Sequence, residues 1–486
     1  MSKTTLAKPT LRHVISINDL TNQEIEAVFG LADHYLENLG DPRVTYRIAR
    51  AASDAQGLIL ATLFYEPSTR TRLSFESAML RLGGNVIVNS DPQTSSAAKG
   101  ESLADSIRVI SNYADAIVLR HPRDGAARLA AEYATVPVIN GGDGGHEHPT
   151  QTLCDLYTLR RQKKKLRNLN VAVSGDLKGS RTIHSFVYAL ARFEANIILM
   201  PAQGMDLPKH VIHRLREEFK CQFKKEPAVP EATGIVDALY VTPNRPHQLS
   251  FIPDQRVDIS LRTGTPGIDV IYVTRFQRER WQDASHSYVK IDVDFLKNKK
   301  YAKTQLLHPL PRVGELDVNL DSDRRAIYFE QAAYGVPVRM ALIAHLLGLA
   351  KRSKIERFES GFAPNEFPLY SRPPEVGLRC INNNCIAHDE IEKPHVANKF
   401  TFHQSEPDSG PRLRCAWCET DVLDFVIARA KTKRYVTSKL MKANRHFALP
   451  SDAIIFSSPG EAEVAGYTPA SRQGSSRRPR NQAIDP

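Results

Sequence analysis

Short apolar runs alternate with longer helix-like stretches along much of this 486-residue chain. The runs have the length of buried strands, and the stretches between them carry apolar residues at helical spacing. The runs lie at 58–64, 85–89, 115–119, 136–140, 170–174, 196–200, 269–273 and 305–308. Such alternation is typical of parallel sheets covered by helices. The sequence therefore predicts an α/β fold with two doubly wound parallel-sheet domains.

The boundary between the two domains is expected at Pro149, because proline favours the first position of a helix. We assign residues 1–149 to the first domain and expect a helix at about 333–352 to complete it. Residues 150–332 form the second domain. Each domain is long enough to bury a core of its own.

The second domain contains two similar runs, "VDALYVT" at 236–242 and "IDVIYVT" at 268–274. Two copies are too few for a repeat array. We therefore interpret them as two strands of one sheet. The residues between them, about 243–267, are interpreted as an insertion.

The composition changes after residue 352. Residues 353–375 contain four prolines and no clear period, which predicts a linker. A small cysteine-bearing module follows at 376–427. Residues 428–486 are predicted to form a basic, largely disordered tail, because their last part is rich in Ser, Pro, Gly and Arg.

The net charge is +11, and the last 58 residues hold eleven Lys or Arg against four Asp or Glu. A basic tail can contact nucleic acid, but a solvated tail is the more ordinary interpretation, so a nucleic-acid partner is not expected. No apolar run approaches the roughly 18 residues of a membrane helix. The N-terminus lacks the apolar segment of a signal peptide. We expect a cytoplasmic protein without membrane association.

The stretch "FYEPSTRTRLSFESAMLRLGG" (64–84) joins a predicted strand to a predicted helix. A helix that starts directly after a strand presents unpaired backbone N–H groups and positive potential, which together attract anions. Ser68, Thr69 and Thr71 add hydroxyl donors, and Arg70 adds a planar fork suited to phosphate oxygens. Such residues can simply be caps, but these are more densely crowded than capping needs. The stretch is predicted to bind phosphate.

The same stretch resembles the carbamoyl-phosphate motif of the aspartate and ornithine carbamoyltransferases. The matching positions are Phe64, Glu66, Ser68, Thr69, Arg70 and Thr71. Further motifs follow in the family's order: "TSSAAKGESLADS" (94–106), "AIVLRHPRDGAARLA" (116–130), "HPTQTL" (148–153), "GDLKGSRTIHS" (175–185), "YVTRFQRER" (272–280) and "LHPLPR" (307–312). The resemblance covers roughly residues 10 to 350 and implies the carbamoyltransferase fold.

The resemblance also implies roles for individual residues. The catalytic residues would be Arg70, Thr71, Arg120 and His148. Carbamoyl phosphate would be bound by Ser68, Thr69, Arg70, Thr71, Lys99, Arg120, His148, Gln151, Leu310 and Pro311. The amine substrate would be bound by Ser95, Lys99, Arg181, Arg275 and Gln277.

The motifs of the second half favour aspartate as the amine substrate. Aspartate brings two carboxylates, and Arg181 and Arg275 can each meet one through a two-point fork. The "HCLP" cysteine of the ornithine enzymes is absent, since position 309 is Pro. Only the second "YVT" run continues as Arg-x-Gln, so the resemblance assigns aspartate binding to Arg275 and Gln277. The resemblance thus implies carbamoyl transfer to L-aspartate, in pyrimidine (UMP) synthesis.

Two other interpretations stay open. One is a carbamoyltransferase for another amine, such as ornithine, and the other is a non-catalytic zinc-bearing assembly protein. The resemblance further implies that the loop with Ser95 and Lys99 completes the active site of a neighbouring subunit. A homotrimer, or a multiple of trimers, is therefore expected.

Four of the six cysteines form two close pairs, Cys380 with Cys385 and Cys415 with Cys418. Two such pairs separated by a loop suit a tetrahedral zinc site, whereas disulfides are disfavoured in the cytosol. We predict one structural zinc per chain. The module resembles the zinc domain of the aspartate carbamoyltransferase regulatory chain over 376–427, which implies a small β-rich domain fused to a catalytic chain.

Overall fold

The structure is a computed structural model in which the chain divides into two compact units. It describes residues 12–39, 57–89, 96–225, 236–242, 268–275, 290–297, 301–349, 369–372, 377–404, 411–441 and 449–470. The first unit is 1–366 with the short segments 382–395 and 417–419, and the second is 367–381, 396–416 and 420–486. Each unit is described by itself.

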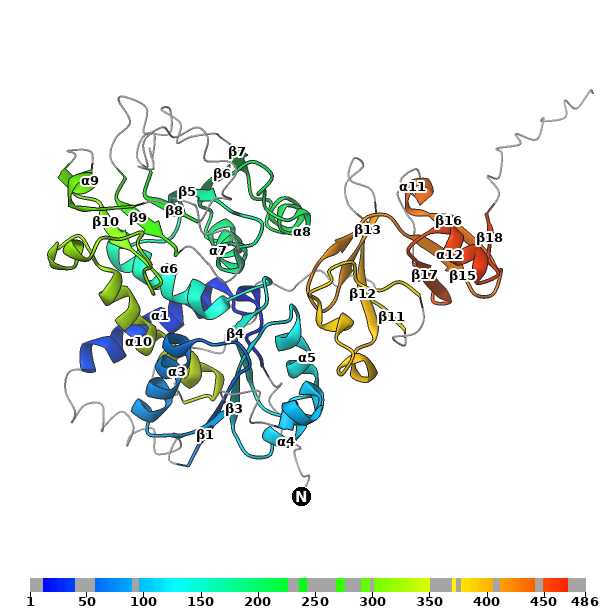
Figure 1. Ribbon diagram of the computed structural model, residues 1–486, viewed down its shortest axis with the longest axis horizontal. Coiled ribbons are helices and arrows are strands. Elements are labelled where there is room, and N and C mark those ends of the chain that lie inside the picture. Colours follow the sequence, from blue (N-terminus) through cyan, green and yellow to red (C-terminus); the bar gives the residue numbers. More distant parts are fainter. Residues whose placement is uncertain are drawn as a thin grey trace, which may run out of the picture. The chain divides into compact units, whose positions relative to one another are not determined.

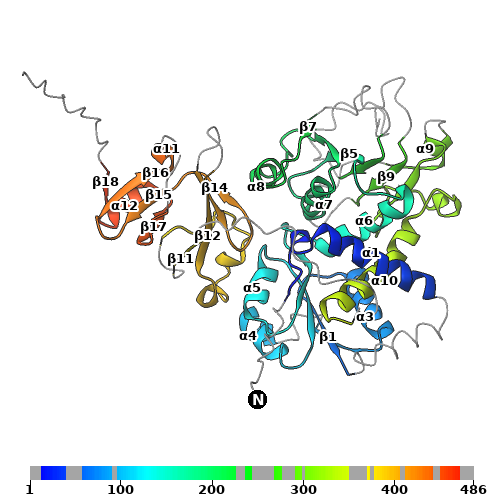
Figure 2. The ribbon, with the colours of Figure 1, turned by 180° about the vertical axis from the view of Figure 1, so that it is seen from behind.

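The first unit contains a four-stranded parallel sheet in the order β2-β1-β3-β4. Its strands are β1 (Ile59–Phe64), β2 (Asn85–Asn89), β3 (Ala116–His121) and β4 (Val138–Asp143). Its helices are α3 (Thr69–Arg81), α4 (Leu103–Ile110) and α5 (Ala126–Tyr133), with 3-10 turns at Ile17–Asp19 and Ser96–Lys99. Figures 1 and 2 show α4 and α5 on one face of this sheet and α3 on the other. Cover on both faces explains why β1 and β3 are apolar almost throughout.

The second sheet of this unit has six parallel strands in the order β10-β9-β8-β5-β6-β7. They are β5 (Asn170–Gly175), β6 (Asn196–Pro201), β7 (Phe223–Lys225), β8 (Ala238–Val241), β9 (Val270–Val273) and β10 (Gln305–Leu307). Around them lie α7 (Arg181–Arg192), α8 (Lys209–His213), α9 (Val293–Lys297), a π turn at Arg214–Glu218 and a 3-10 turn at Val318–Ser322. The two similar runs are neighbours, as predicted: Tyr240 of β8 is paired with Tyr272 of β9, and their rings stack with centroids 4.1 Å apart.

Three longer helices connect the two sheets. They are α1 (Asn22–Asn38), α6 (Pro149–Lys163) and α10 (Tyr328–Leu346). Helix α10 packs on α1, α3 and α6, and Figures 1 and 2 show it alongside α1 and α3. One apolar core runs from Leu60 and Phe75 through Leu156 and Ile343 to Val171, so it joins both sheets.

The strands predicted from the alternating pattern are all present, with ends that differ by at most three residues. Strand β7 and helix α1 had no counterpart among the predicted elements. The insertion expected at 243–267 lies outside the described residues. No helix in the described part of the chain is long and apolar enough to cross a membrane.

The second unit is β-rich, as expected, and holds two four-stranded sheets. The first, in the order β11-β12-β13-β14, is antiparallel and consists of β11 (Leu369–Arg372), β12 (Asn398–Gln404), β13 (Pro411–Cys415) and β14 (Asp421–Val422). The second, in the order β17-β15-β16-β18, consists of β15 (Val426–Arg429), β16 (Arg434–Thr437), β17 (Ala453–Phe456) and β18 (Thr468–Pro469). Helices α11 (Ser438–Met441) and α12 (Pro459–Val464) accompany the second sheet.

The prediction of a largely disordered tail from residue 428 is wrong for 428–441 and 449–470, which form most of the second sheet. Its small core contains Val426, Ala428, Tyr435, Phe456, Ala462 and Tyr467. The basic residues at the turn between β15 and β16 are exposed, whereas Val426, Ile427, Ala428 and Tyr435 of the two strands are buried. The Ser-, Pro-, Gly- and Arg-rich composition that suggested disorder belongs mainly to residues 471–486, which lie outside the described residues.

The linker predicted at 353–375 is also corrected in part. Residues 369–372 form β11, whose residue Tyr370 is paired with Phe400 of β12. Tyr370 is buried and its hydroxyl accepts the backbone N–H of Ile455 at 3.2 Å. An edge strand rich in neighbouring prolines is compatible with sheet geometry, because an edge strand needs hydrogen bonds on one side only.

Candidate functional site

The carboxyl ends of parallel strands from both sheets face one cavity of about 1420 Å³. The lining residues that end or follow β1, β3, β5 and β9 are Glu66, Arg120, Asp176, Thr274 and Arg275. Open α/β sheets bind their ligands at this edge, where connections leave the strands. The cavity is therefore the candidate site, and each wall comes from a different connection.

Helix α3 begins at this cavity. Its N-cap residue, Ser68, makes no side-chain capping bond, and its first turn contains no acidic residue. Thr71 is buried, whereas Arg70 donates from Nη2 to the backbone carbonyl of Leu310 at 2.6 Å. The helix start thus offers backbone N–H groups, hydroxyls and a guanidinium in one wall, which is the donor set a phosphate group requires.

A carboxylate, Glu66, lies between two arginines of the cavity. Its Oε1 accepts from Arg120 Nη2 at 2.6 Å and from Arg181 Nη2 at 3.0 Å. Burial opposes the ionisation of Glu66, but Arg181 and Arg120 outweigh it and lower the pKa to about 2. The arginines also donate to the backbone carbonyls of Gly141 at 3.2 Å and Gly144 at 2.7 Å. In this cavity the guanidinium groups of Arg120 and Arg181 are therefore held in place by acceptors of the protein itself.

His148 directly precedes α6 and is buried. Burial, and then the charges of Arg181 and Arg120, lower its pKa well below the usual range. The imidazole is therefore neutral near pH 7. Its backbone N–H donates to Ser185 Oγ at 3.0 Å, which fixes the start of the helix. A neutral imidazole can donate one hydrogen bond to a carbonyl oxygen without adding charge to the site.

Most of the residues predicted from the sequence meet in this cavity. Its lining includes Ser68, Thr69, Arg70, Thr71, Arg120, His148, Gln151, Arg181, Arg275, Leu310 and Pro311. Lys99 is an exposed residue at the end of a 3-10 turn and is not among the lining residues. Ser95 and Gln277 lie outside the described residues.

Glu66 and Arg339 are among the lining residues that were given no role from the sequence. Glu66 stands within the quoted phosphate motif, but its pairing with Arg120 and Arg181 depends on segments far apart in the chain. Arg339 is a buried residue of α10 whose Nη1 donates to the Gly335 carbonyl at 3.0 Å. A single arginine within the apolar run "VPVRMALIAHLL" was a usable signal, because an arginine is seldom buried without a partner.

The four cysteines predicted to bind a metal lie together. Cys380, Cys385, Cys415 and Cys418 are all buried, and their sulfur atoms lie within 4.8 Å of one another. Tetrahedral zinc with Zn–S bonds of about 2.3 Å holds its sulfurs about 3.8 Å apart, so this set fits the metal. Four thiolates fill the coordination sphere and leave no position for a substrate.

Two segments that contain Cys385 and Cys418, 382–395 and 417–419, belong to the first unit. The carboxylate of Asp124 accepts from the side-chain amides of Asn382 at 2.7 Å and Asn384 at 2.8 Å. The next residue, Gly125, has φ of +86°, and a Cβ there would come within 2.7 Å of the Trp417 backbone. Only glycine permits this close approach.

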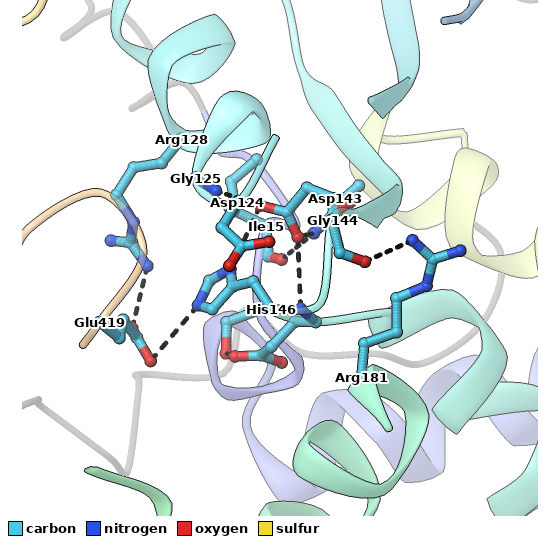
Figure 3. Close-up of polar contacts among 12 residues, drawn as sticks. Ile15, Asp124, Gly125, Arg128, Asp143, Gly144, His146, Arg181 and Glu419 are labelled. Carbon is cyan, nitrogen blue, oxygen red and sulfur yellow. Dashed lines mark hydrogen bonds and ion pairs between the residues drawn. The ribbon is translucent and has the colours of Figure 1, made fainter. Parts of the chain in front are cut away.

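Glu419 forms the second part of this contact. Figure 3 shows it between Arg128 and His146. Its Oε1 accepts from Arg128 Nη2 at 3.1 Å, and its Oε2 accepts from Arg214 Nη1 at 2.5 Å and lies 3.7 Å from His146 Nε2. His146 Nδ1 in turn lies 3.2 Å from Asp143 Oδ2. The result is a buried chain of alternating charges.

The pKa shifts follow from this arrangement. Burial opposes the charged form of His146, but Asp143 and Glu419 outweigh it and raise its pKa well above the usual range. Burial likewise opposes the ionisation of Glu419, yet Arg214, His146 and Arg128 lower its pKa well below the usual range. Both groups are therefore charged near pH 7. Because Glu419 is already paired with cations, we interpret His146, Glu419 and their charged neighbours as an ion-pair network and not as a metal site.

Family models match most of the chain. Residues 12–161 match the carbamoyl-P binding domain of the aspartate/ornithine carbamoyltransferases, and residues 254–346 match their Asp/Orn binding domain. Residues 375–427 match the metal binding domain of the aspartate carbamoyltransferase regulatory chain. The aspartate carbamoyltransferase catalytic subunit of Clostridium acetobutylicum is 42% identical over 344 residues, which are 70% of this chain and 98% of that protein. The chain belongs to the aspartate carbamoyltransferase family.

Solved structures of this family agree with the assignment. The catalytic subunit of the M. jannaschii aspartate transcarbamoylase is 42% identical and has a TM-score of 0.54, over 70% of this chain and all of that one. The Trypanosoma cruzi aspartate transcarbamoylase in complex with carbamoyl phosphate and aspartate is 30% identical, with a TM-score of 0.53 over 68% of this chain and 95% of that one. The predicted carbamoyltransferase fold is thereby confirmed.

The Glu419 network yields a stability prediction. Glu419→Gln would remove the anion that Arg214 and His146 share and leave each of these cations with one acidic partner, Glu218 and Asp143. This change should lower the free energy of unfolding by about 3 kcal/mol. Chemical denaturation of the full chain measures this, with Glu194→Gln as the control. Glu194 pairs with Arg167 on the surface, where both side chains are more than half exposed, so its loss should cost less than about 1 kcal/mol. Equal effects of the two changes would contradict the buried network.

Proposed function

We propose that the chain transfers the carbamoyl group of carbamoyl phosphate to the amine of L-aspartate, giving N-carbamoyl-L-aspartate and phosphate. One observation carries this proposal: the phosphate motif at the start of α3 lines the same cavity as Arg181 and Arg275, which follow strands of the second sheet. The names of the relatives support it. The product would enter pyrimidine (UMP) synthesis, and we infer a cytoplasmic location, where reduced thiols suit a cysteine–metal site.

The phosphate would be bound at the start of α3. Backbone N–H groups and the hydroxyls of Ser68 and Thr69 would donate to its oxygens, and the Arg70 guanidinium would meet two of them. As the carbamoyl–phosphate bond breaks, charge grows on the leaving group. The same donors would stabilise that charge, and a lysine from outside this cavity, Lys99, would add to them.

The carbamoyl carbonyl would be polarised from three sides. Arg120, the neutral His148 and the Thr71 hydroxyl would donate to its oxygen, and these bonds would strengthen as the attacking amine turns the carbon tetrahedral. Gln151 would contact the carbamoyl amide. No covalent intermediate with the protein is required, because the donors act on charge and the cavity supplies orientation.

Aspartate would occupy the side of the cavity next to the second sheet. Its carboxylates would meet Arg181 and Arg275, with Gln277 beyond the described residues, whereas Leu310 and Pro311 would contact carbamoyl phosphate. A substrate carboxylate at Arg181 would compete with Glu66, which holds that guanidinium at 3.0 Å. An ornithine side chain would instead bring a second amine among these cations, so no observation favours it.

We further propose that zinc is the metal of the four-cysteine set, one ion per chain, and that the assembly is a homotrimer or a multiple of trimers. Zinc bound there would fold the cysteine loops and take no part in carbamoyl transfer. The trimer is supported by Lys99, which is exposed and does not line the cavity of its own chain. In this family the loop that contains Lys99 and Ser95 is lent to a neighbouring subunit.

Turnover with carbamoyl phosphate and a panel of amino acids tests the reaction. L-Aspartate should be the preferred acceptor, and Arg70→Ala should lower kcat by about 10²–10³, because a donor to developing charge is lost. Arg81→Ala is the control, since Arg81 is an exposed residue at the other end of the same helix. Equal turnover of ornithine, or full activity of Arg70→Ala, would contradict the assignment.

Elemental analysis of washed protein tests the metal. One equivalent of zinc per chain is expected, and Cys418→Ser should lose most of it because a tetrahedral site depends on every ligand. Cys221→Ser should keep the zinc, since Cys221 is not part of the four-cysteine set. Less than half an equivalent in the unaltered protein would argue against a structural zinc.

Mixing two inactive variants tests the shared site. Lys99→Ala and Arg70→Ala should each be nearly inactive alone, yet trimers refolded from both should regain activity. At equal mixing, about a quarter of the sites in a head-to-tail ring would combine an intact Arg70 with an intact Lys99. Mixed trimers of confirmed composition that stay inactive, or an active isolated monomer, would show that the site is complete within one chain.

A further inference from the structure

Asp155 lies just behind the cavity, on α6, one helical turn after Gln151. It is 1% exposed, and its Oδ1 accepts three hydrogen bonds. The donors are Gln151 Nε2 at 2.9 Å, Tyr272 OH at 3.1 Å and Gln331 Nε2 at 3.2 Å. These donors belong to α6, β9 and α10, respectively. One oxygen of Asp155 therefore connects a strand of the second sheet with α6, which lies between the sheets, and with α10, which packs on α1 and α3.

The first consequence concerns Gln151, which lines the cavity. A carboxamide can exchange its oxygen and nitrogen positions by a half turn unless its neighbours distinguish the two. Oδ1 of Asp155 accepts, so it selects the NH2 group of Gln151 and leaves the carbonyl Oε1 as the acceptor available to the cavity. The NH2 of a carbamoyl group needs an acceptor of this kind. A Gln151 amide rotated by a half turn would direct its NH2 group at the carbamoyl NH2, and two hydrogen-bond donors would then face each other.

The second consequence concerns Gln331. Because its Nε2 donates to Asp155, its Oε1 is directed to the backbone N–H of His308, which it accepts at 2.9 Å. The Leu310 N–H then donates to His308 Nδ1 at 2.8 Å, and the Leu310 carbonyl accepts from Arg70 at 2.6 Å. This series of hydrogen bonds connects Asp155 to the arginine of the phosphate motif.

The third consequence concerns β9. Tyr272 is buried in this strand, and Thr274 and Arg275, which follow it, line the cavity. The bond from the Tyr272 hydroxyl to Asp155 ties the end of the strand to α6. It thereby fixes the distance between the residues proposed for aspartate and Gln151, which is proposed for the carbamoyl group.

We propose that Asp155 is a positioning residue for carbamoyl transfer, which sets the amide orientation of Gln151 and Gln331 and holds β9 against α6. This inference rests on the proposed function. Asp155 touches no reacting atom and acts through the side chains it orients. Its second oxygen, Oδ2, is buried and has no hydrogen-bond partner among the described residues. Oδ1 therefore accepts every hydrogen bond that the described residues donate to this carboxyl group.

The environment of Asp155 decides which replacement preserves its role. Burial raises its pKa to about 7, despite the three donors, so a large fraction of the group is neutral near that pH. A neutral carboxyl with its proton on Oδ2 has the same shape as an asparagine whose carbonyl oxygen replaces Oδ1. Leucine has a similar size but offers no acceptor. A comparison of Asp155→Asn with Asp155→Leu therefore separates the effect of the hydrogen-bond acceptor from the effect of side-chain volume.

The first experiment compares these two variants in the full chain. Asp155→Leu should lower kcat/KM for aspartate by about 10- to 100-fold, the effect of misplacing oriented groups by about 1 Å. Asp155→Asn should stay within about threefold of the unaltered protein, because the acceptor remains. Calorimetric titrations add a readout independent of turnover. Asp155→Leu should lose more affinity for carbamoyl phosphate than for inorganic phosphate, since Gln151 serves the carbamoyl group.

The second experiment uses a matched pair of tyrosines and does not depend on the folding of Asp155→Leu. Tyr157 lies on α6, is buried, and donates its hydroxyl to Asp33 Oδ1 at 2.8 Å. Tyr272→Phe and Tyr157→Phe each remove one tyrosine–carboxyl hydrogen bond. Both should lower the thermal midpoint to a similar extent, whereas only Tyr272→Phe should lower kcat/KM, by about tenfold.

The outcomes are distinct. Folded Asp155→Leu with the activity of Asp155→Asn would overturn the positioning role, and so would equal losses of kcat/KM in Tyr272→Phe and Tyr157→Phe. Equal losses of affinity for carbamoyl phosphate and inorganic phosphate in Asp155→Leu would overturn the orientation of Gln151. No carbamoyl transfer by the unaltered protein and by Tyr157→Phe would instead overturn the proposed function, and the positioning role with it.

Discussion

Buried positive charge is the constraint on which this fold depends. The guanidinium groups of Arg120, Arg181 and Arg339 line one cavity with little exposure to water. A buried cation without a partner would cost several kcal/mol. Each has one here: Glu66 and the Gly141 carbonyl for Arg120, Glu66 and the Gly144 carbonyl for Arg181, and the Gly335 carbonyl for Arg339. Two anionic substrates would complete a charge balance that the chain meets only in part.

Helix α6 carries this constraint from one sheet to the other. Ten of its first eleven residues are buried, so it has no solvent-exposed face along that length. A polar helix can be buried in this way only when its polar groups are paired. Asp155 meets three donors near its middle, and Lys163 pairs with Asp237 at 2.6 Å and with Asp269 at its end. Apart from Gln151, which is on α6 itself, these partners lie on α10, on β9 or directly before β8 and β9. The helix therefore fixes the position of the second sheet and of α10 relative to the residues at its own start.

The sequence alone predicted the two parallel sheets and eleven of the residues that line the cavity, and the reasons for the failures are physical. Apolar strands flanked by helices are a local pattern, and the phosphate motif is a run of adjacent residues. Glu66 and Asp155 matter through partners far away in the chain, and a pattern along the sequence does not record which distant side chains meet. The second small sheet was missed for a different reason: the Ser-, Pro- and Arg-rich composition of the chain's last residues outweighed the short apolar runs around Val426 and Tyr435, which form a buried core.

Segment 417–419 and the cavity share one loop of the first unit, residues 143–148. On one side, Asp143 pairs with His146, which meets Glu419, and Gly145 donates its backbone N–H to Asp124 at 2.6 Å. On the other side, the Gly144 carbonyl holds Arg181 and the loop ends at His148. Because Glu419 directly follows Cys418, a metal that orders the cysteine loops would also order the anion that pairs with His146. The metal would then affect the cavity through the position of this loop. Loss of the metal would first lower the stability of the protein, and turnover would fall only as a consequence.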